Sequence, residues 1–452
     1  MTRGTPPVST PPAEPATFTS FDGGVIERAA RARPDRYRMV ESLPEGPRIA
    51  RGGGYSYAAA SFGAGSLVVD MRAFDRVLSL DEESRTIEVE AGARLEDVLA
   101  VTAPRGLYLP VQPGYPAITV GGCLAANVHG KNPHREGTFR RSVLDLTLHH
   151  PRTGTLRVSR AAEADLFELT CGGYGLTGIV LAATLKLEPL PGWVAEVERV
   201  AIGGLAEGYA EVRARTDRSA FAYTWHDGTP VAGRFGRGFV YEGRIPPGPP
   251  PSSPVVPRYR RLTAAGRGAL RAPLWNPVTT SLLCSGFRWG ESRKPLRTEM
   301  PLFDAMFPFA RRGEYFLLYG RRGLAEYQSL VPHAAAEGFL AALEREVVRA
   351  RPPLVMASMK LFRGERGLLR FESDGVCVTV NLVRSSGGVE FLRTLDRLTL
   401  DAGGLPHVVK DSRLPAEVVA RAYPGYEEFR ARRRAHDPEA LFRSELSARL
   451  GL

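Results

Sequence analysis

The segment GGCLAANVHGKN, residues 121–132, holds a group of residues with the types and spacing that chemistry requires. His129, Lys131 and Asn132 follow directly on glycines and small side chains. Such a histidine accepts a proton or binds a ligand, or else it bonds to the backbone and merely holds the loop. Both interpretations of His129 stay open. Lys131 and Asn132 are expected to fix the loop and to contact a ligand rather than to exchange protons.

Two further lysines stand beside apolar residues. Lys410, in VVKDSR, can stabilise an anion or, when desolvated, act as a base; the alternative is a surface lysine paired with Asp411. Lys360, in SMKLF, alternates with apolar neighbours, so its side chain leaves a strand on the face opposite theirs. We expect that face to line a cavity where Lys360 binds a phosphate; a solvated strand position is the alternative. Trp225, Tyr327 and Gln328 are weaker candidates for cavity walls.

The composition is that of a globular protein, with 43% hydrophobic and 24% charged residues, and no apolar run is long enough for a membrane span. We therefore expect a cytoplasmic location. The net charge of +11 fits an anionic partner, or simply an arginine-rich composition. Nucleic-acid binding would need interleaved aromatic and basic residues, which are not seen. Four separated cysteines without a Cys-x-x-Cys pair argue against zinc and against a disulfide framework, and no other spacing suggests a metal.

Three glycine-rich segments lie in the first 180 residues, at 50–60, 113–132 and 171–180. Backbone N–H groups without a neighbouring Cβ form concave nests for phosphate oxygens. Three such segments predict a large anionic cofactor that lies across several loops. Gly121 and Gly122 would each cost roughly 1 kcal/mol in a helix interior, so we expect them to make room for that cofactor.

The motif GYGLTG, at 173–178, fits G-x-G-x-x-G but stands in the wrong context. A dinucleotide-binding fingerprint follows a strand and opens a helix. Here a helical pattern precedes the motif and a strand pattern follows it, so we reject a Rossmann fold. A P-loop motif is also missing from the sequence.

Hydrophobic periodicity predicts an α+β protein. Alternating strand patterns lie at 66–71, 86–92, 142–159, 179–190, 355–364 and 375–383, and helical patterns at 95–106, 161–173, 334–350, 391–404 and 418–442. We expect four parts: a disordered leader, 1–19; a cofactor domain, 20–193; a substrate domain, 194–400; and a segment that returns to the first domain, 401–452. The Pro-rich stretch 244–261 is expected to be an exposed loop.

The order of the glycine segments resembles the FAD-binding domain of the vanillyl-alcohol-oxidase (PCMH) family over roughly residues 20–193. The resemblance implies a two-subdomain FAD-binding domain, followed by an α+β substrate domain with an antiparallel sheet. Where many members carry a histidine bonded to the flavin, this chain has Tyr55, so non-covalent FAD is expected. The FAD contacts implied are Arg51, Gly52, Gly53, Gly54, Tyr55, Ser56, Tyr57, Pro113, Gly114, Thr119, Val120, Gly121, Gly122, Cys123, Ala126, Asn127, His129, Gly130, Asn132, Gly173, Gly175, Gly178, Ile179 and Lys410.

VHGKN with the GTF that follows, SMKLF, GVCV and VKDSR together resemble the flavoprotein oxidase subunits of decaprenylphosphoryl-ribose epimerases. The resemblance implies oxidation of a sugar hydroxyl at C2 to a ketone, with Lys410 and His129 as catalytic residues and an NAD(P)H-dependent short-chain reductase as a possible partner. Substrate contacts implied are Lys131, Trp225, Tyr327, Gln328, Lys360, Phe362, Cys377 and His407.

Departures from that family fall where the substrate would lie. His407 replaces a tyrosine, Glu326 replaces a glutamine, and Asp374 and Gly375 replace polar and aromatic residues. They leave the polyprenyl part of the substrate open. A sugar-lactone or alditol oxidase that uses oxygen is the alternative, although its relatives usually carry the covalent histidine that Tyr55 replaces.

Overall fold

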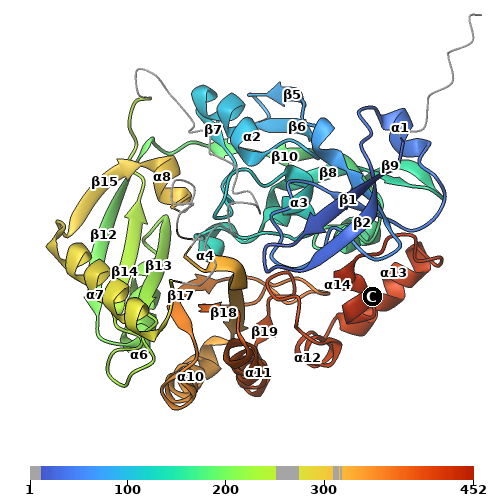
Figure 1. The fold of residues 1–452 in the computed structure, drawn as a ribbon. Coiled ribbons are helices and arrows are strands. Elements are labelled where there is room, and N and C mark those ends of the chain that lie inside the picture. Colours follow the sequence, from blue (N-terminus) through green and yellow to red (C-terminus); the bar gives the residue numbers. More distant parts are fainter. Residues whose placement is uncertain (1–11, 251–273, 309–314, 316–317) are drawn as a thin grey trace, which may run out of the picture.

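The computed structural model describes residues 12–250, 274–308, 315 and 318–452, which form three main β-sheets and a two-stranded ribbon (Figure 1). Two of the sheets come from residues before 190. The first has the order β1-β2-β4-β3, and the second, entirely antiparallel, has the order β5-β6-β10-β8-β9. Their strands are β1 Glu14–Thr19, β2 Val25–Ala32, β3 Arg48–Arg51, β4 Leu67–Asp70, β5 Val77–Asp81, β6 Thr86–Glu90, β8 Val143–His150, β9 Gly154–Ser159 and β10 Ile179–Lys186. The ribbon joins β7 (Leu107–Tyr108) to β11 (Glu188–Pro189).

The expected disordered leader is wrong for its second half. Residues Glu14–Thr19 form β1, which pairs with β2 in antiparallel register, and Arg31 of β2 forms an ion pair with Glu14 at 3.1 Å. Phe18 is buried against Phe62. A buried aromatic side chain supplies the stabilisation that the Pro/Thr-rich composition did not predict. The expectation for residues 1–11 lies outside the described residues.

The third sheet is antiparallel and has eight strands in the order β15-β12-β14-β13-β17-β18-β16-β19. Its strands are β12 Val194–Ile202, β13 Phe221–Asp227, β14 Gly238–Arg244, β15 Arg297–Pro301, β16 Leu324–Val331, β17 Leu354–Phe362, β18 Gly375–Val383 and β19 Leu405–Pro406. The two long central strands β17 and β18 lie where the sequence predicted strands, and β18 is rich in β-branched residues. The described part of the Pro-rich stretch, before residue 251, carries the end of β14 and an exposed run of prolines.

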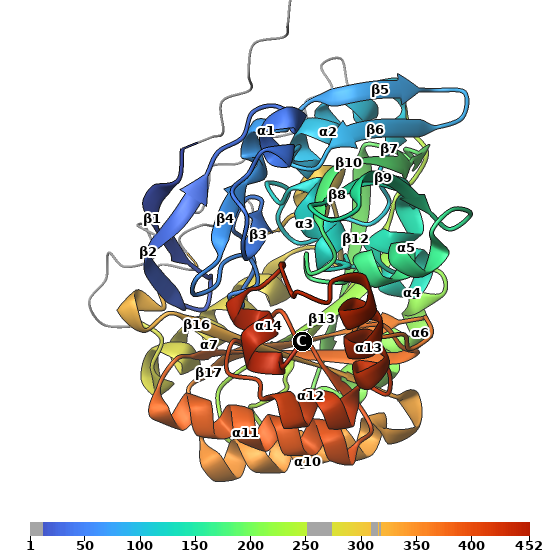
Figure 2. The same cartoon turned by 90° about the vertical axis from the view of Figure 1, so that its right-hand side faces the viewer.

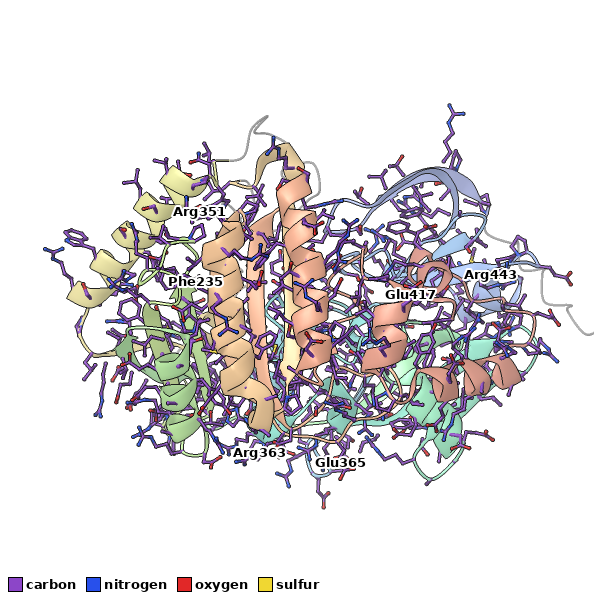
Figure 3. All side chains as sticks on the ribbon, turned by 90° about the horizontal axis from the view of Figure 1, so that it is seen from below. Phe235, Arg351, Arg363, Glu365, Glu417 and Arg443 are labelled. Carbon is purple, nitrogen blue, oxygen red and sulfur yellow. The ribbon has the colours of Figure 1, made fainter. Side chains whose placement is uncertain are left out.

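Helices α6 (Leu205–Thr216), α10 (Ala336–Ala350) and α11 (Ser386–Asp401) cover one face of this sheet, as seen edge-on in Figure 2 and from below in Figure 3. Each helix buries an apolar stripe with helical spacing. In α10 the stripe includes Phe339, Leu343 and Val347. Because this face is sealed by helices, the opposite face is left to meet the first two sheets, which lie above it in Figure 1.

The remaining helices connect the sheets and close the fold. They are α1 Tyr37–Glu41, α2 Leu95–Thr102, α3 Val120–Ala125, α4 Pro133–Glu136, α5 Ala164–Thr170, α7 Pro277–Arg293, α8 Leu302–Met306, α12 Ala416–Ala422, α13 Tyr426–His436 and α14 Glu445–Leu450. Across the described ranges, none is both long and apolar enough to cross a bilayer.

The last fifty residues touch both halves of the molecule. Strand β19 pairs with β16 in the eight-stranded sheet. Farther along, the Ala58 N–H donates to the carbonyl of Val409 at 2.9 Å, and the Arg48 N–H donates to that of Leu441 at 2.7 Å. The segment therefore fastens the cofactor half to the sheet.

Candidate active site

Helix α3 begins the segment that carries His129, and it contains Gly121 and Gly122 in its first turn despite their cost in a helix. The room that they are expected to make for the cofactor stays a prediction. A Cβ on Gly121 would lie 3.0 Å from both the Cβ and the carbonyl oxygen of Ala91, and the Gly121 N–H donates to that oxygen at 2.7 Å. Gly121 therefore lets α3 pack directly against the end of β6. Thr119 caps the helix, since its Oγ1 accepts from the Gly122 N–H at 3.3 Å.

The loop after α3 is held from several sides. Asn127 adopts a left-handed conformation, with φ of 44°, and its Oδ1 accepts from the Arg140 N–H at 3.0 Å. A Cβ on Gly130 would lie 2.7 Å from the carbonyl oxygen of Gln112. Asn132 donates through Nδ2 to the carbonyl of Pro110 at 3.1 Å. Asn132 thus has the loop-fixing role expected of it, and the loop presents His129 to the open face of the eight-stranded sheet.

A hydrogen-bond chain runs from Lys360 on β17 through His129 to Gln328 on β16. Lys360 Nζ donates to His129 Nδ1 at 2.9 Å and to the carbonyl of Gly130 at 3.1 Å. Because an ammonium group only donates, Nδ1 is the accepting nitrogen and the proton of the ring lies on Nε2. His129 Nε2 then donates to Gln328 Oε1 at 3.3 Å.

The chain continues along β16 to a carboxylate. Gln328 Nε2 donates to Glu326 Oε1 at 2.8 Å, and Lys410 Nζ lies 2.8 Å from the same oxygen. Lys410 Nζ also lies 3.9 Å from the centre of the Tyr57 ring, a cation–π distance. Lys410 is therefore paired with Glu326 and not with Asp411, which binds Arg413.

Tyr327 does not join this cluster, which corrects the expectation that it lines the cavity. Its hydroxyl donates to Asp396 of α11 at 2.9 Å, on the helix-covered face of the sheet. The reason is the two-residue period of a strand: Glu326 and Gln328 point to one face and Tyr327 between them points to the other. Two adjacent residues of one strand cannot both line the same cavity.

Burial and mutual repulsion lower the pKa values of the basic groups. The pKa of His129 falls well below its usual value, first because the ring is desolvated and then because Lys360, His407 and Lys410 are near. His129 is consequently neutral. Desolvation lowers the pKa of Lys360 to about 8, with Lys410 adding to the effect, and that of Lys131 to about 7, with Lys360 adding to it.

Aromatic rings and a thiol complete the surroundings of His129. Phe362 packs edge-on against the His129 ring at 4.9 Å between centroids, and His407 stacks on Phe371 at 4.3 Å. Cys377 is buried on β18, with its Sγ 4.0 Å from Gln328 Oε1. These three predicted contacts, Phe362, His407 and Cys377, therefore surround the same point.

Lys131 and Trp225 lie at one side of the cluster. Lys131 donates to the carbonyl of Ala305 and stands over the ring of Tyr223, with Nζ 4.5 Å from its centroid. Trp225 packs against Phe287 of α7 at 4.4 Å. Tyr223 and Trp225 share one face of β13, so this side offers an aromatic wall.

The first and second glycine segments meet. A Cβ on Gly52 would lie 2.1 Å from Thr119 Oγ1, and Gly54 has a φ of 76°. Arg51 turns away from this contact: its guanidinium donates to Ser61 Oγ at 2.7 Å and lies over the rings of Phe18 and Phe62. The Arg51 side chain therefore braces the loop, and the cofactor contact expected of Arg51 stays a prediction.

The third glycine segment packs on the second. The Gly172 N–H donates to the carbonyl of Leu124, and the Tyr174 N–H to that of Ala125, at 3.0 and 2.9 Å. Gly178, with φ of 151°, leaves no room for a Cβ beside the carbonyl of His149, and Ile179 is fully buried in the core. Gly178 and Ile179 therefore contribute to the packing of the segment, and the cofactor contacts expected of both stay predictions.

The residues around the meeting point fit a polar cofactor. Between the first two glycine segments lies a cavity of about 170 Å³ lined by Gly53, Tyr55, Arg72, Asp75, Gly92, Arg94, Ala117 and Thr119. Buried polar atoms nearby have no hydrogen-bond partner among the described residues: Ser56 Oγ, Gln112 Oε1, Asn127 Nδ2, Asn132 Oδ1 and His407 Nδ1. Such atoms normally find partners, and a ligand with several donors and acceptors would supply them.

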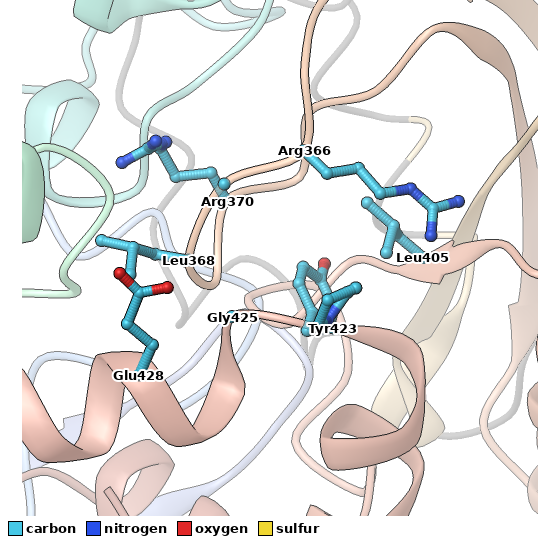
Figure 4. Close-up of a pocket in the computed structure, with 9 residues that line it drawn as sticks. Arg366, Leu368, Arg370, Leu405, Tyr423, Gly425 and Glu428 are labelled. Carbon is cyan, nitrogen blue, oxygen red and sulfur yellow. The ribbon is translucent and has the colours of Figure 1, made fainter.

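A second cavity, of about 200 Å³, lies away from this site, between the loop at 366–370 and helix α13 (Figure 4). Its arginines are already engaged: Arg366 binds the carbonyl of Gly403, and Arg370 binds Glu168 and Glu372. Among the described residues that line this cavity, none carries a buried polar atom without a partner like those around His129.

The sequence analysis placed Glu326 near the substrate as a departure from the family, but it did not predict the pairing of Glu326 with Lys410. The sequence did contain a signal, since Glu326 lies two positions before Gln328 and must share its strand face. Its pairing with Lys410, 84 positions later, depends on the return of the C-terminal segment to the sheet.

Comparisons with known proteins agree with this arrangement. The family model described as FAD binding domain matches residues 45–159. Decaprenylphosphoryl-beta-D-ribose oxidase of Mycolicibacterium smegmatis is 30% identical over 454 residues, which cover 98% of this chain and 96% of the relative. An uncharacterized protein of Streptomyces coelicolor is 31% identical over 79% of this chain and 100% of its own length. Cytokinin dehydrogenase 6 of rice is 36% identical over 152 residues, 32% of this chain and 29% of the relative.

Proposed function

The chain belongs to the family of FAD-linked oxidases that includes decaprenylphosphoryl-beta-D-ribose oxidase, and from this premise we propose that it oxidises the C2 hydroxyl of an anionic furanose to a ketone. It is an FAD-dependent oxidoreductase that acts on a CH–OH group. When bound, FAD supplies the hydride acceptor for such an oxidation at N5. The protein must then hold the sugar, receive the hydroxyl proton and balance charge.

One observation carries the choice of an anionic substrate. Lys131, Lys360 and Lys410 converge with two histidines on the open face of the sheet, and Glu326 is the one carboxylate that the described residues place in contact with them. Buried cations without enough counter-charge are costly. A phosphate group on the substrate would supply that negative charge, and we assign the binding of this phosphate to Lys360 and Lys131.

The aromatic groups are assigned to the sugar. Trp225 packs against Phe287 of α7, and Phe362 contacts His129 directly. Flat apolar surfaces of this kind pack against the less polar face of a furanose. His129 is held neutral with both ring nitrogens engaged, which supports a role in orienting the substrate.

We assign non-covalent binding of FAD to this chain. Tyr55 stands where a covalent histidine would be needed, and its ring lies 5.0 Å from that of Tyr115, next to Gly53. The atoms assigned to hold FAD are the backbone of residues 52–57, Thr119 and the unpartnered polar atoms of Ser56, Gln112 and Asn127.

The test is anaerobic bleaching of the FAD absorbance by candidate sugars. We expect decaprenylphosphoryl-β-D-ribose or β-D-ribose 1-phosphate to bleach the holoenzyme, whereas free ribose, without the anionic group, should not. Comparing the first two sugars shows whether a polyprenyl chain is needed. Bleaching by neutral lactones or alditols alone would refute the proposal and favour the alternative activity.

A ketone formed in this way requires a second enzyme if the sugar is to be recovered. We propose an NAD(P)H-dependent short-chain reductase as that partner. Incubating both enzymes with the active sugar and NAD(P)H should yield the C2 epimer, detected by NMR spectroscopy. Return of the unchanged sugar alone would contradict this partner.

A further inference from the structure

Oxidation of an alcohol releases a proton as well as a hydride, and the cluster limits which group receives the proton. His129 has no free lone pair, because Nδ1 accepts from Lys360 and Nε2 donates to Gln328. Lys410 is held as the cation of an ion pair with Glu326. Neither His129 nor Lys410, the two residues expected to be catalytic, is therefore free to accept the proton.

Glu326 differs from its neighbours in two ways. It carries a negative charge, and one of its carboxylate oxygens accepts no hydrogen bond from the described residues. Its side chain is almost buried, with a residue exposure of 8%. Gln328 and Lys410 both contact the same oxygen, Oε1. The other oxygen, Oε2, receives no hydrogen bond from any residue that the structure describes. An ionised carboxylate oxygen of this kind only accepts.

We propose that Glu326 Oε2 takes the hydroxyl proton of the substrate, an inference that rests on the proposed oxidation of a secondary alcohol. The O–H bond breaks and its proton forms an O–H bond with Glu326, while the carbinol hydrogen leaves as hydride to FAD. The alcohol is oxidised to the ketone by two electrons, FAD is reduced by the same two, and the carboxylate becomes a neutral carboxylic acid.

Because Glu326 is paired with Lys410, the proton transfer to Glu326 also changes the charge balance at Lys410. Before the reaction the ammonium of Lys410 is balanced by Glu326 at 2.8 Å. Protonation of Glu326 removes that negative charge, so the charge of Lys410 becomes available to balance the negative charge that FAD gains. The ion pair thus couples proton transfer to the electrostatics of the cofactor.

Two substitutions with a matched control test the assignment. Glu326→Gln keeps the size and the hydrogen-bond capacity but loses the base, and Glu326→Asp keeps a carboxylate. The control is Glu390→Gln, since Glu390 is exposed on α11 and pairs only with the exposed Arg393 among described residues. FAD affinity and near-ultraviolet circular dichroism establish that each variant folds and binds cofactor.

Rapid mixing with the active sugar is expected to show FAD reduction slowed about 100-fold or more in Glu326→Gln, less in Glu326→Asp and not in Glu390→Gln. A second measurement needs no sugar: sulfite, an anion that adds to oxidised flavin, is titrated against each holoenzyme. Because Glu326 no longer shields Lys410, Glu326→Gln should bind sulfite about tenfold more tightly.

The outcomes separate the two proposals. Wild-type reduction rates in Glu326→Gln overturn the proton acceptor, and unchanged sulfite affinity overturns the coupling to Lys410. If none of the sugars bleaches the wild type, the proposed function fails, while the sulfite titration still decides whether Glu326 controls the charge beside FAD.

Discussion

Replacing Lys360 by methionine should change the stability of the folded protein in a way that depends on pH, stabilising it at pH 7 and destabilising it at pH 9.5. Burial lowers the pKa of Lys360 to about 8 from its ordinary 10.5. The titratable groups around it are His129, Lys131, Glu326, Cys377, His407 and Lys410. The folded protein therefore holds the protonated lysine less readily than the unfolded chain does. Methionine has nearly the same length and carries no charge to desolvate.

The magnitude follows from proton linkage. Below pH 8 both states are protonated and the full penalty is present, about 3 kcal/mol at pH 7, since a tenfold change in proton affinity is worth about 1.4 kcal/mol. Between pH 8 and 10.5 the unfolded chain binds more protons, so wild-type stability rises with pH and the penalty falls to about 1 kcal/mol at pH 9.5. Loss of the hydrogen bonds from Lys360 to His129 and Gly130 destabilises the variant by about 1 kcal/mol each at both pH values, which opposes the gain from removing the buried charge.

The assay is urea unfolding of wild type and Lys360→Met with excess FAD at pH 7 and pH 9.5. The stability difference between them should be about 2 kcal/mol more favourable to the variant at pH 7 than at pH 9.5. Lys294→Met, at an exposed position, is the control. A difference that is the same at both pH values, or that favours the wild type more at pH 7, would refute the reasoning about Lys360. The variant should also lose affinity for the anionic sugar.

Three other predictions concern single contacts. Tyr327→Phe removes the bond to Asp396 and should lower the free energy of unfolding by about 1 kcal/mol without changing FAD reduction; a tenfold slower reduction would return Tyr327 to the site. Gly52→Ala places a Cβ 2.1 Å from Thr119 Oγ1 and should weaken FAD binding about tenfold or more, measured by fluorescence titration; unchanged affinity would show that the loop adapts. Acid precipitation of the wild type should release all of its flavin into the supernatant, and flavin retained in the pellet would contradict non-covalent binding at Tyr55.

Much of the site could be predicted from the sequence because its residues lie in short, unusual contexts. A lysine between apolar residues in a strand, as in SMKLF, has few explanations, and Lys360 indeed reaches His129. The same strand rule, applied fully, would have excluded Tyr327 and placed Glu326 on the same face as Gln328. That error was one of local geometry, and the information needed to avoid it was present.

Other features depend on contacts that no local pattern contains. Gly121 is small because Ala91 lies against it, and the guanidinium of Arg51 turns toward Ser61. β1 forms because β2 offers it an edge. The pairing of Glu326 with Lys410 requires the eight-stranded sheet and the final segment together. In each case long-range packing decides among several locally acceptable states.

The return of residues 401–452 to both halves has a consequence for how the protein is made. Lys410 leaves the ribosome after every glycine segment and after strand β16 have been synthesised. The carbonyls of Val409 and Leu441 then bind the N–H groups of Ala58 and Arg48, closing loops of several hundred residues. Such long closures are slow and are completed after shorter contacts form. During synthesis, the nascent chain can therefore form its glycine-rich loops before it possesses the lysine that pairs with Glu326.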